Sequence, residues 1–295
     1  MMIDRSFGDR LFNLINYTLL TLLTLIVLYP LVFVLSASIS NPEHVLRGDM
    51  WLIPKGFNLD AYAKIFQNKD ILLGYSNTVL YTVIGTALNV VMTICAAYPL
   101  SRRDLAGRGL VTGLIVFTMF FGGGLIPTYL LIKNLNMLDT LWVMIIPNAV
   151  SVWNIIIMRT FFQQSIPGEL QESAMIDGCT HIQTLLRIVL PLSMPIIAVM
   201  VLFYAVGHWN SYFNALIYLT TKEKFPLQLI LREILIQSDS GEFVKLTSES
   251  AVRMKMSVEG LKYAVLVVAN LPMLMLYPFL QRYFVKGIMI GALKG

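Results

Sequence analysis

Long apolar stretches alternate with polar segments along the whole chain. The first stretch, 11–35, has 25 residues and no charged side chain. At about 1.5 Å per residue, a helix of this length crosses the roughly 30 Å of hydrocarbon in a bilayer. Five further stretches are similar, so the pattern predicts an all-α polytopic membrane protein with six transmembrane helices. The predicted spans are 11–35, 75–100, 110–132, 138–158, 192–220 and 263–280.

Two of these stretches allow a second interpretation. The first could be a cleaved signal peptide ending near Ser36-Ala37-Ser38, but its apolar run is long for a signal core, which favours an uncleaved span. The third is interrupted by Gly122-Gly123-Gly124 and Pro127. That interruption is either a hinge used during alternating access or a packing kink, since broken helices are tolerated where they line cavities.

Basic residues at the span ends predict the orientation. Six spans place both termini on one side, and three basic groups fall on that side. Lysines and arginines in the long loops on the other side are mixed with acids and count less, so we expect both termini to be cytoplasmic. The three groups are Arg5 and Arg10; Arg102, Arg103 and Arg108; and Arg282, Lys286 and Lys294.

The composition supports a membrane protein. Apolar residues make up 57% of the chain and charged residues 13%, about half the usual charged share, and the mean hydropathy is +0.71. The net charge of +5 does not indicate nucleic-acid binding, because the basic residues are scattered at span ends. No internal repeat or linker is evident, so residues 1–295 are expected to form one transmembrane domain in the cell membrane, in contact with lipid.

The polar segment 159–191 has an order of its own. Pro167, Gly168 and Glu169 suit the start of a helix that runs to Ile176. Asp177-Gly178 ends this helix, because glycine readily takes the left-handed conformation. Thr180 can then cap a second helix that reaches Leu190-Pro191. We therefore predict a helix, a sharp turn and another helix at a membrane surface.

This segment resembles the cytoplasmic coupling loop of ABC importer permeases, with its E-A-A, D-G and I-x-L-P pattern. Ser173 stands at the second position of the first motif, where the change from alanine is small. FFGGGLIPTYL at 120–130, the Trp209-Asn210 pair and YPFLQRYFVKGIMIGALKG at 277–295 extend the resemblance to the carbohydrate-uptake branch, the MalF/MalG-like permeases, and most closely to its LplC/YtcP type. The matching positions of the loop are Glu172, Ala174, Asp177, Gly178, Ile188, Leu190 and Pro191.

The resemblance implies a permease subunit of a binding-protein-dependent importer for a sugar or oligosaccharide. It implies a second permease subunit in a heterodimer, a dimer of ATP-binding subunits and an extracellular solute-binding protein. The long loops 36–74 and 221–262 are candidate contacts for that binding protein. The loop positions above and Ser173 would contact the ATPase, unless 159–191 is an ordinary amphipathic surface segment. Gly287, Gly291, Lys294 and Gly295 in the tail would also reach the ATPase, unless the tail is only a disordered basic end.

The chain offers no chemistry for an enzyme. It has no Gly-Lys dipeptide, so the phosphate-binding P-loop pattern is absent, and ATP must be used by a partner. Its three histidines and two cysteines show no metal-ligand spacing, and we expect no catalytic residue, cofactor or metal in this chain. A secondary, ion-coupled carrier is the alternative function, but it predicts buried ionisable residues, and His208 is the exception in spans that otherwise nearly lack them.

A polar patch interrupts the fifth predicted span at 208–214. Asn210 and Asn214 are four residues apart and would share one face of a continuous helix. With Trp209 and Tyr212 they are candidates for a pore lining or a sugar contact. The alternative is an interfacial aromatic belt whose asparagines bond a neighbouring helix. Both interpretations stay open.

Overall fold

The computed structural model describes residues 7–239, 256, 258–276 and 278, and within them every regular element is a helix. The chain divides into two units, which are described separately. Unit 1 contains Met1–Lys69 and Leu231–Asn270, and unit 2 contains Asp70–Ile230 and Leu271–Gly295. The prediction of a single transmembrane domain stays a prediction.

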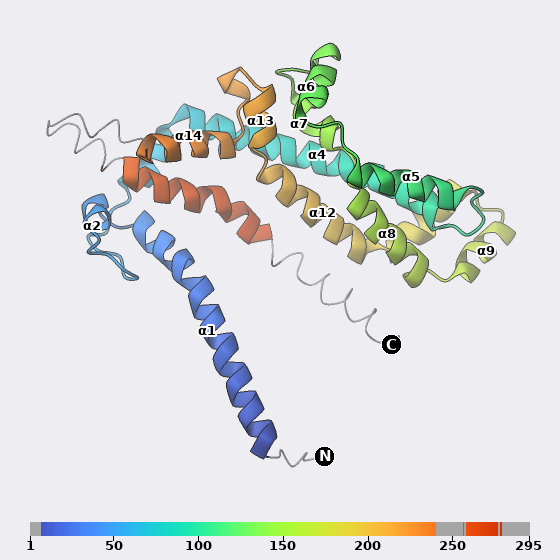
Figure 1. Ribbon diagram of the computed structural model, residues 1–295, viewed down its shortest axis with the longest axis horizontal. Coiled ribbons are helices and arrows are strands. Elements are labelled where there is room, and N and C mark those ends of the chain that lie inside the picture. The colour runs from blue at the N-terminus through green and yellow to red at the C-terminus, as the bar shows by residue number, and fades with distance from the viewer. Residues whose placement is uncertain (1–6, 240–255, 257, 277, 279–295) are drawn as a thin grey trace. The chain divides into compact units, whose positions relative to one another are not determined.

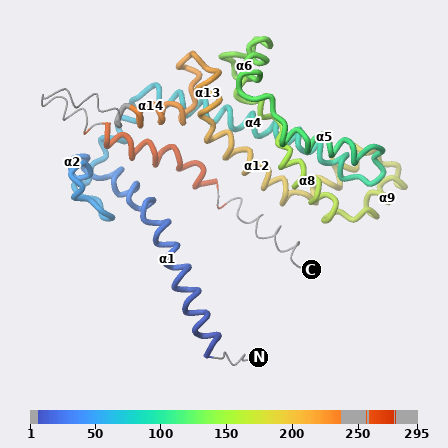
Figure 2. Tube along the Cα trace, in the orientation of Figure 1, coloured from blue at the N-terminus to red at the C-terminus, as the bar shows by residue number. Residues whose placement is uncertain are grey.

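Unit 1 is built around α1 (Phe7–Ser38), a single helix of 32 residues. Figures 1 and 2 show α2 (Pro42–Leu46) beside its C-terminal end. The apolar window of α1 is not buried inside the structure, which suits a helix surrounded by lipid. α3 (Asp60–Gln67), part of α14 and the helix Val258–Leu276 as far as Asn270 are the other helical segments described for this unit. The predicted outer loop 36–74 is therefore partly helical.

Side chains join the end of α1 to its neighbours in unit 1. The ring of Phe33 meets that of Tyr263 edge-on, with centroids 5.9 Å apart. The Tyr62 hydroxyl donates to the Ser38 hydroxyl at 2.8 Å. These contacts fix the C-terminal end of α1, whereas the rest of that helix is exposed.

Unit 2 contains the remaining elements, and its longest is α4 (Lys69–Ser101). Several of its other helices are short pieces separated by breaks. Along the chain they are α5 (Arg108–Phe120), α6 (Leu125–Asn134), α7 (Leu141–Ile145), η1 (Ile146–Asn148), α8 (Val152–Ser165), α9 (Gly168–Ile176), α10 (His181–Thr184), η2 (Leu185–Val189), α11 (Leu190–Leu192), α12 (Met194–Trp209), α13 (Phe213–Tyr218), η3 (Lys222–Lys224) and α14 (Leu227–Asp239), which continues into unit 1.

The structure breaks three of the predicted spans. Only α1, α4 and Val258–Leu276 are single helices long enough to cross a membrane in the described part of the chain. Three further pairs qualify only as bent spans, so three to six spans are present by length and composition. The bends are 109° between α5 and α6, 53° between the pieces Leu141–Asn148 and Val152–Ser165, and 82° between His181–Leu192 and α12.

Two predicted helix ends differ from those observed. The helix of the fourth predicted span does not end at 158, because α8 continues to Ser165, and its Arg159 and Gln163 side chains bond the end of α4. The fifth span is not one helix over 192–220, because the chain leaves the helix after Trp209 and re-enters at Phe213. The break at Gly122–Gly124 lies where the sequence predicts an interruption. Part of the sixth predicted span, 277 and 279–280, lies outside the described residues.

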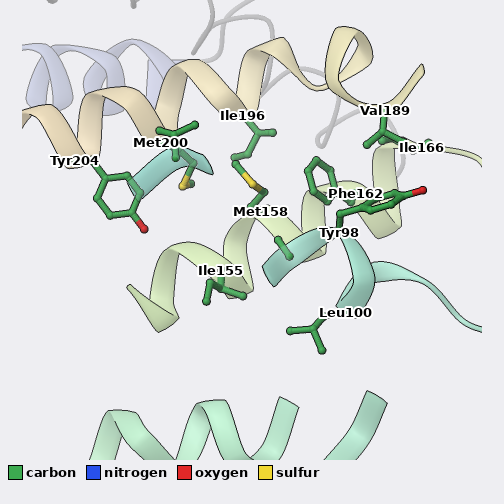
Figure 3. Packing of buried hydrophobic residues seen from close by; sticks show 12 residues of the cluster. Tyr98, Leu100, Ile155, Met158, Phe162, Ile166, Val189, Ile196, Met200 and Tyr204 are labelled. Atoms are coloured by element: carbon green, nitrogen blue, oxygen red, sulfur yellow. The ribbon is translucent and has the colours of Figure 1, made fainter. Parts of the chain in front are cut away.

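The main core of unit 2 lies between α4, α8 and α12 (Figure 3). Phe162 and Met158 of α8 are fully buried there, beside Met200 of α12 and Tyr98 of α4. α4 also buries polar side chains and exposes many apolar ones, as expected of a helix with lipid on its outer face. Its buried polar positions include Thr78, Thr82, Thr86, Asn89 and Thr93.

A polar clasp joins two connections at the other end of unit 2. Asp139 precedes α7, and its carboxylate accepts bonds from the backbone N–H groups of Thr220 and Thr221, both at 3.0 Å. It also accepts from the Thr221 hydroxyl and from Lys224 Nζ at 2.8 Å. These hydrogen bonds, with Lys224 first, hold the pKa of Asp139 well below its ordinary value. The clasp lies outside the bent span Leu141–Ser165.

Candidate functional site

The predicted turn after Asp177 is present, and its hydrogen bonds define it. Gly178 has φ +78°, in the left-handed region that favours glycine. Its N–H donates to the Met175 carbonyl at 3.0 Å, and the Cys179 N–H donates to the Ala174 carbonyl at 2.9 Å. This pair of bonds is the Schellman motif, which closes the C-terminal end of α9. The turn is therefore fixed by local backbone chemistry.

The second helix begins as the sequence predicts. The Thr180 hydroxyl accepts from the Gln183 N–H, and the Gln183 side chain accepts from the Thr180 N–H at 2.9 Å, which completes a capping box. The helix then widens into the π segment Leu185–Val189 before Leu190. One rigid turn and one capped start thus set the angle between the two helices.

α9 is a short helix with most of its surface free. Ala174 is its buried residue, at 4% exposure, while Glu172 and Ser173 are exposed. Ile176 at the end of the helix is 87% exposed. The described contacts within this chain thus leave the Glu172, Ser173 and Ile176 side chains of α9 uncovered.

Both arms of the loop are anchored in the core between α4, α8 and α12. Phe162 and Ile166 precede α9 and are buried, and Val189 follows it and is fully buried (Figure 3). Of the predicted positions, Ile188 and Leu190 are only partly buried and Pro191 is exposed. Val189 is therefore an anchor that the motif did not identify.

The end of α4 is held by side chains of α8. Arg159 Nε donates to the Leu100 carbonyl at 3.0 Å, and Gln163 Nε2 donates to the Ser101 carbonyl at 3.3 Å. The last carbonyls of a helix have no partner within it, and a cation there meets the negative end of the dipole. The sequence did not indicate this role for Arg159.

A cleft of about 790 Å³ separates the connection after α4 from α9. Arg102, Arg103 and Arg108 line one side, and Glu169 and Glu172 line the other. The basic residues that predict the orientation of the chain thus lie beside the candidate coupling helix.

Arg102 is the buried member of that basic group. Its guanidinium binds both carboxylate oxygens of Asp104, at 2.9 and 2.7 Å. These bonds lower the pKa of Asp104 and raise that of Arg102. Arg102 also donates to the Tyr98 hydroxyl at 3.4 Å, and Tyr98 donates to the His181 carbonyl at 3.4 Å. The connection after α4, the core and the second helix of the loop are thereby linked.

The candidate pore residues do not share a helix face. Asn210 follows the last residue of α12, and its amide bonds the Val206 carbonyl at 2.9 Å, whereas Asn214 lies on α13. Trp209 is buried against Tyr75, with ring centroids 5.7 Å apart, while Tyr212 is exposed. The prediction of a common face is wrong, because the helix ends between the two asparagines. The tail candidates Gly287, Gly291, Lys294 and Gly295 lie outside the described residues.

Comparisons with known proteins identify the family. No family model matches the chain. It is 43% identical to protein LplC of Bacillus subtilis (strain 168), over 98% of this chain and 96% of that protein. It is 44% identical to the polygalacturonan/rhamnogalacturonan transport system permease protein YtcP of the same strain, over 97% of this chain and 99% of that protein.

A solved structure agrees with these relatives. The structure of a bacterial ABC transporter involved in the import of the acidic polysaccharide alginate has a TM-score of 0.86 and 32% sequence identity. The match covers 96% of this chain and 100% of that chain. The fold and these likenesses define an integral membrane transport protein, not an enzyme. The chain belongs to the ABC transporter permeases.

Proposed function

We propose that this chain is one permease subunit of an importer for an oligosaccharide, and that the loop 159–191 couples it to a separate ATPase. The observation that carries the proposal is the arrangement of α9. Its buried Ala174 and closed turn at Gly178 fix its direction, while Glu172, Ser173 and Ile176 remain exposed. Because both arms of the loop are buried in the core, a push on α9 reaches α8 and α12 directly.

The proposed assembly has the usual parts of such an importer. A second permease subunit, a dimer of ATP-binding subunits and an extracellular solute-binding protein would complete it. We propose six spans, three of them bent, with both termini and α9 on the cytoplasmic side. Closure of the ATPase dimer on ATP would move α9, and the spans would change from inward-facing to outward-facing. Arg102, Arg103 and Arg108 beside α9 support this orientation, since basic residues favour the cytoplasmic side.

The substrate proposal rests on the relatives. One is named for polygalacturonan and rhamnogalacturonan transport, and the similar structure belongs to an alginate importer. Both names include acidic polysaccharides, so an oligosaccharide with uronic acid residues is the first candidate. Uptake by cells with and without this chain should be compared for labelled oligogalacturonides, rhamnogalacturonan fragments and a neutral arabino-oligosaccharide. Uptake of none of the three would contradict the oligosaccharide assignment.

The coupling role is tested on the exposed face of α9. Glu172→Lys reverses a charge that faces the cleft, and we expect less ATPase to co-purify with the permease pair in mild detergent. Gln164→Lys, also at an exposed position, is the control because it adds a lysine before the loop turns into α9. Equal recovery of ATPase with both variants would contradict the role of Glu172.

A further inference from the structure

The fourth predicted span is bent at a break between η1 and α8, and this break leaves backbone groups that need hydrogen-bond partners. η1 ends at Asn148 and α8 begins at Val152, so the carbonyls before the break and the N–H groups after it lack helical bonds. In hydrocarbon, with no water available, such groups must be satisfied by protein. This break lies at the N-terminus of α8, and the coupling loop follows the C-terminus of the same helix.

Side chains of α4 and α12 supply partners for two of those groups. Asn89 Nδ2 donates to the Asn148 carbonyl, and the Tyr204 hydroxyl accepts from the Ser151 N–H at 3.4 Å. Asn89 and Thr93 are fully buried, and both Tyr204 and His208 are less than 10% exposed. Both sides of the break are therefore bonded to the neighbouring helices.

The bond from Asn89 to the Asn148 carbonyl also determines which atoms donate in the neighbouring hydrogen bonds of His208 and Tyr204. Since the Asn89 amide donates to a carbonyl, its Oδ1 faces His208 Nε2 at 2.8 Å, so His208 carries its proton on Nε2. Thr93 Oγ1 donates to the Asn89 carbonyl at 2.7 Å, so Tyr204 donates to Thr93 Oγ1, also at 2.7 Å. Each of these four groups thus makes at least one hydrogen bond in the network.

The spacing places the two helices in register. Asn89 and Thr93 are four residues apart on α4, and Tyr204 and His208 are four apart on α12, so each pair shares a face. Gly85 lies one further turn along α4, beneath the imidazole. A Cβ on Gly85 would meet three ring atoms of His208 at 2.4 to 2.8 Å, so only glycine lets the ring reach Asn89.

We propose that Asn89, Tyr204 and His208 are positioning residues that lock the start of α8 to α4 and α12. The hydrophobic core holds the rest of α8 to the same two helices, so the three would move as one body with the coupling loop. Without these hydrogen bonds, α8 would rotate at the break. A displacement of α9 would then change the angle of α8 and would not be transmitted to α4 and α12. This inference rests on the proposed coupling role of the loop.

The test measures whether the body stays rigid when ATP drives the complex. Spin labels are placed at Gln164→Cys near the loop end of α8 and at Ser76→Cys on α4, both exposed, after Cys95 and Cys179 are replaced by serine. Pulsed electron resonance then gives the distance between labels in the reconstituted importer, with no nucleotide and with ATP plus vanadate. We expect one unchanged distance in the otherwise native chain.

Two variants should release the lock by different routes. Tyr204→Phe removes one hydroxyl at constant volume, and Gly85→Ala displaces the His208 ring. In each we expect a shifted or broadened distance that appears only with ATP plus vanadate. Gly207→Ala is the control, because its added Cβ has no neighbour within 4 Å, and it should behave as the native chain.

Three results would overturn the inference. They are a nucleotide-dependent shift in the native chain, unchanged distances in both variants, or a variant shift already present without nucleotide. Co-purification of the ATPase is measured on the same samples. Loss of the ATPase from Glu172→Lys together with unchanged distances in both Tyr204→Phe and Gly85→Ala would reject the lock and leave the coupling role standing, whereas normal recovery of ATPase from Glu172→Lys would count against the proposed coupling contact itself.

Discussion

Arg159 binds the last turn of a helix that precedes it by almost sixty residues, because its Nε donates to the Leu100 carbonyl at 3.0 Å. This bond joins the start of the loop 159–191 to the end of α4. It satisfies a carbonyl that α4 cannot satisfy itself, and it places a positive charge at the negative end of the helix dipole.

Replacing Arg159 should therefore loosen the loop from α4. We expect Arg159→Met to cost about 1.5 to 3 kcal/mol, the range for a hydrogen bond to a charged group. The measurement is the apparent melting temperature of the purified permease pair. Arg187→Met is the control, since Arg187 is an exposed cation on the same loop. An equal loss in both variants would show that Arg159 acts only through net charge.

The clasp at Asp139 predicts a dependence on pH. A carboxyl whose pKa is lowered in the folded state stabilises that state above its ordinary pKa, near 3.9, and the effect is lost as the pH falls below it. Asp139→Asn should lower the melting temperature at pH 7, and its difference from the native chain should shrink as the pH drops below about 4. A difference that is constant from pH 7 to pH 3 would contradict this account.

The cation of the clasp can be tested by itself. Lys224 binds both the carboxylate and the backbone carbonyl of Asp139, but its side chain is 42% exposed, so Lys224→Met should destabilise the protein by only about 0.5 to 1 kcal/mol. Lys222, on the same short helix, has no ion pair with another described residue, and Lys222→Met is the matched control. Equal effects of the two changes would show that the contact seen here contributes nothing specific.

The two candidate pore asparagines should behave differently. Asn210 bonds the backbone of α12 and accepts from Gln228, so Asn210→Leu should lower the amount of assembled complex. Asn214 is partly buried on α13, and its side chain bonds no other described residue, so Asn214→Leu should lower uptake while assembly stays normal. Both quantities are measured in one strain. Reduced assembly in Asn214→Leu would assign it to helix packing instead.

The parts of the site that were predictable are those fixed by nearby residues. The turn at Gly178 follows from its own φ and from bonds within four or five residues, and the capping box joins Thr180 to Gln183. Such local chemistry is visible in a sequence. The helix α9 and the start of the second helix were therefore found at nearly their observed positions.

The parts that were missed depend on distant partners. α8 runs past its predicted end because Arg159 and Gln163 bond the end of α4, and no local pattern shows that. The break after Trp209 was missed because hydropathy measures how apolar a stretch is and does not show where the backbone stops being helical. Val189 was missed because the motif names its neighbours, although its burial follows from packing against α4 and α8.

The central claim is that the loop 159–191 transmits force, and the turn at Gly178 tests it most directly. A Cβ at this position has no neighbour within 4 Å, so any cost of a side chain comes from the backbone conformation rather than from a collision. Valine is β-branched and strongly disfavoured at φ +78°, whereas asparagine tolerates the left-handed region. Gly178→Val should therefore tilt α9 against the second helix, and Gly178→Asn should keep the turn.

The measurement is ATP hydrolysis stimulated by the binding protein in reconstituted vesicles, with co-purification of the ATPase on the same samples. We expect Gly178→Val to insert normally but to lose the ATPase or the stimulation, at a cost of about 1 to 3 kcal/mol for the strained residue. Gly178→Asn should stay close to the native chain. Normal association and normal stimulated hydrolysis in Gly178→Val would contradict the assignment of this loop as the coupling element.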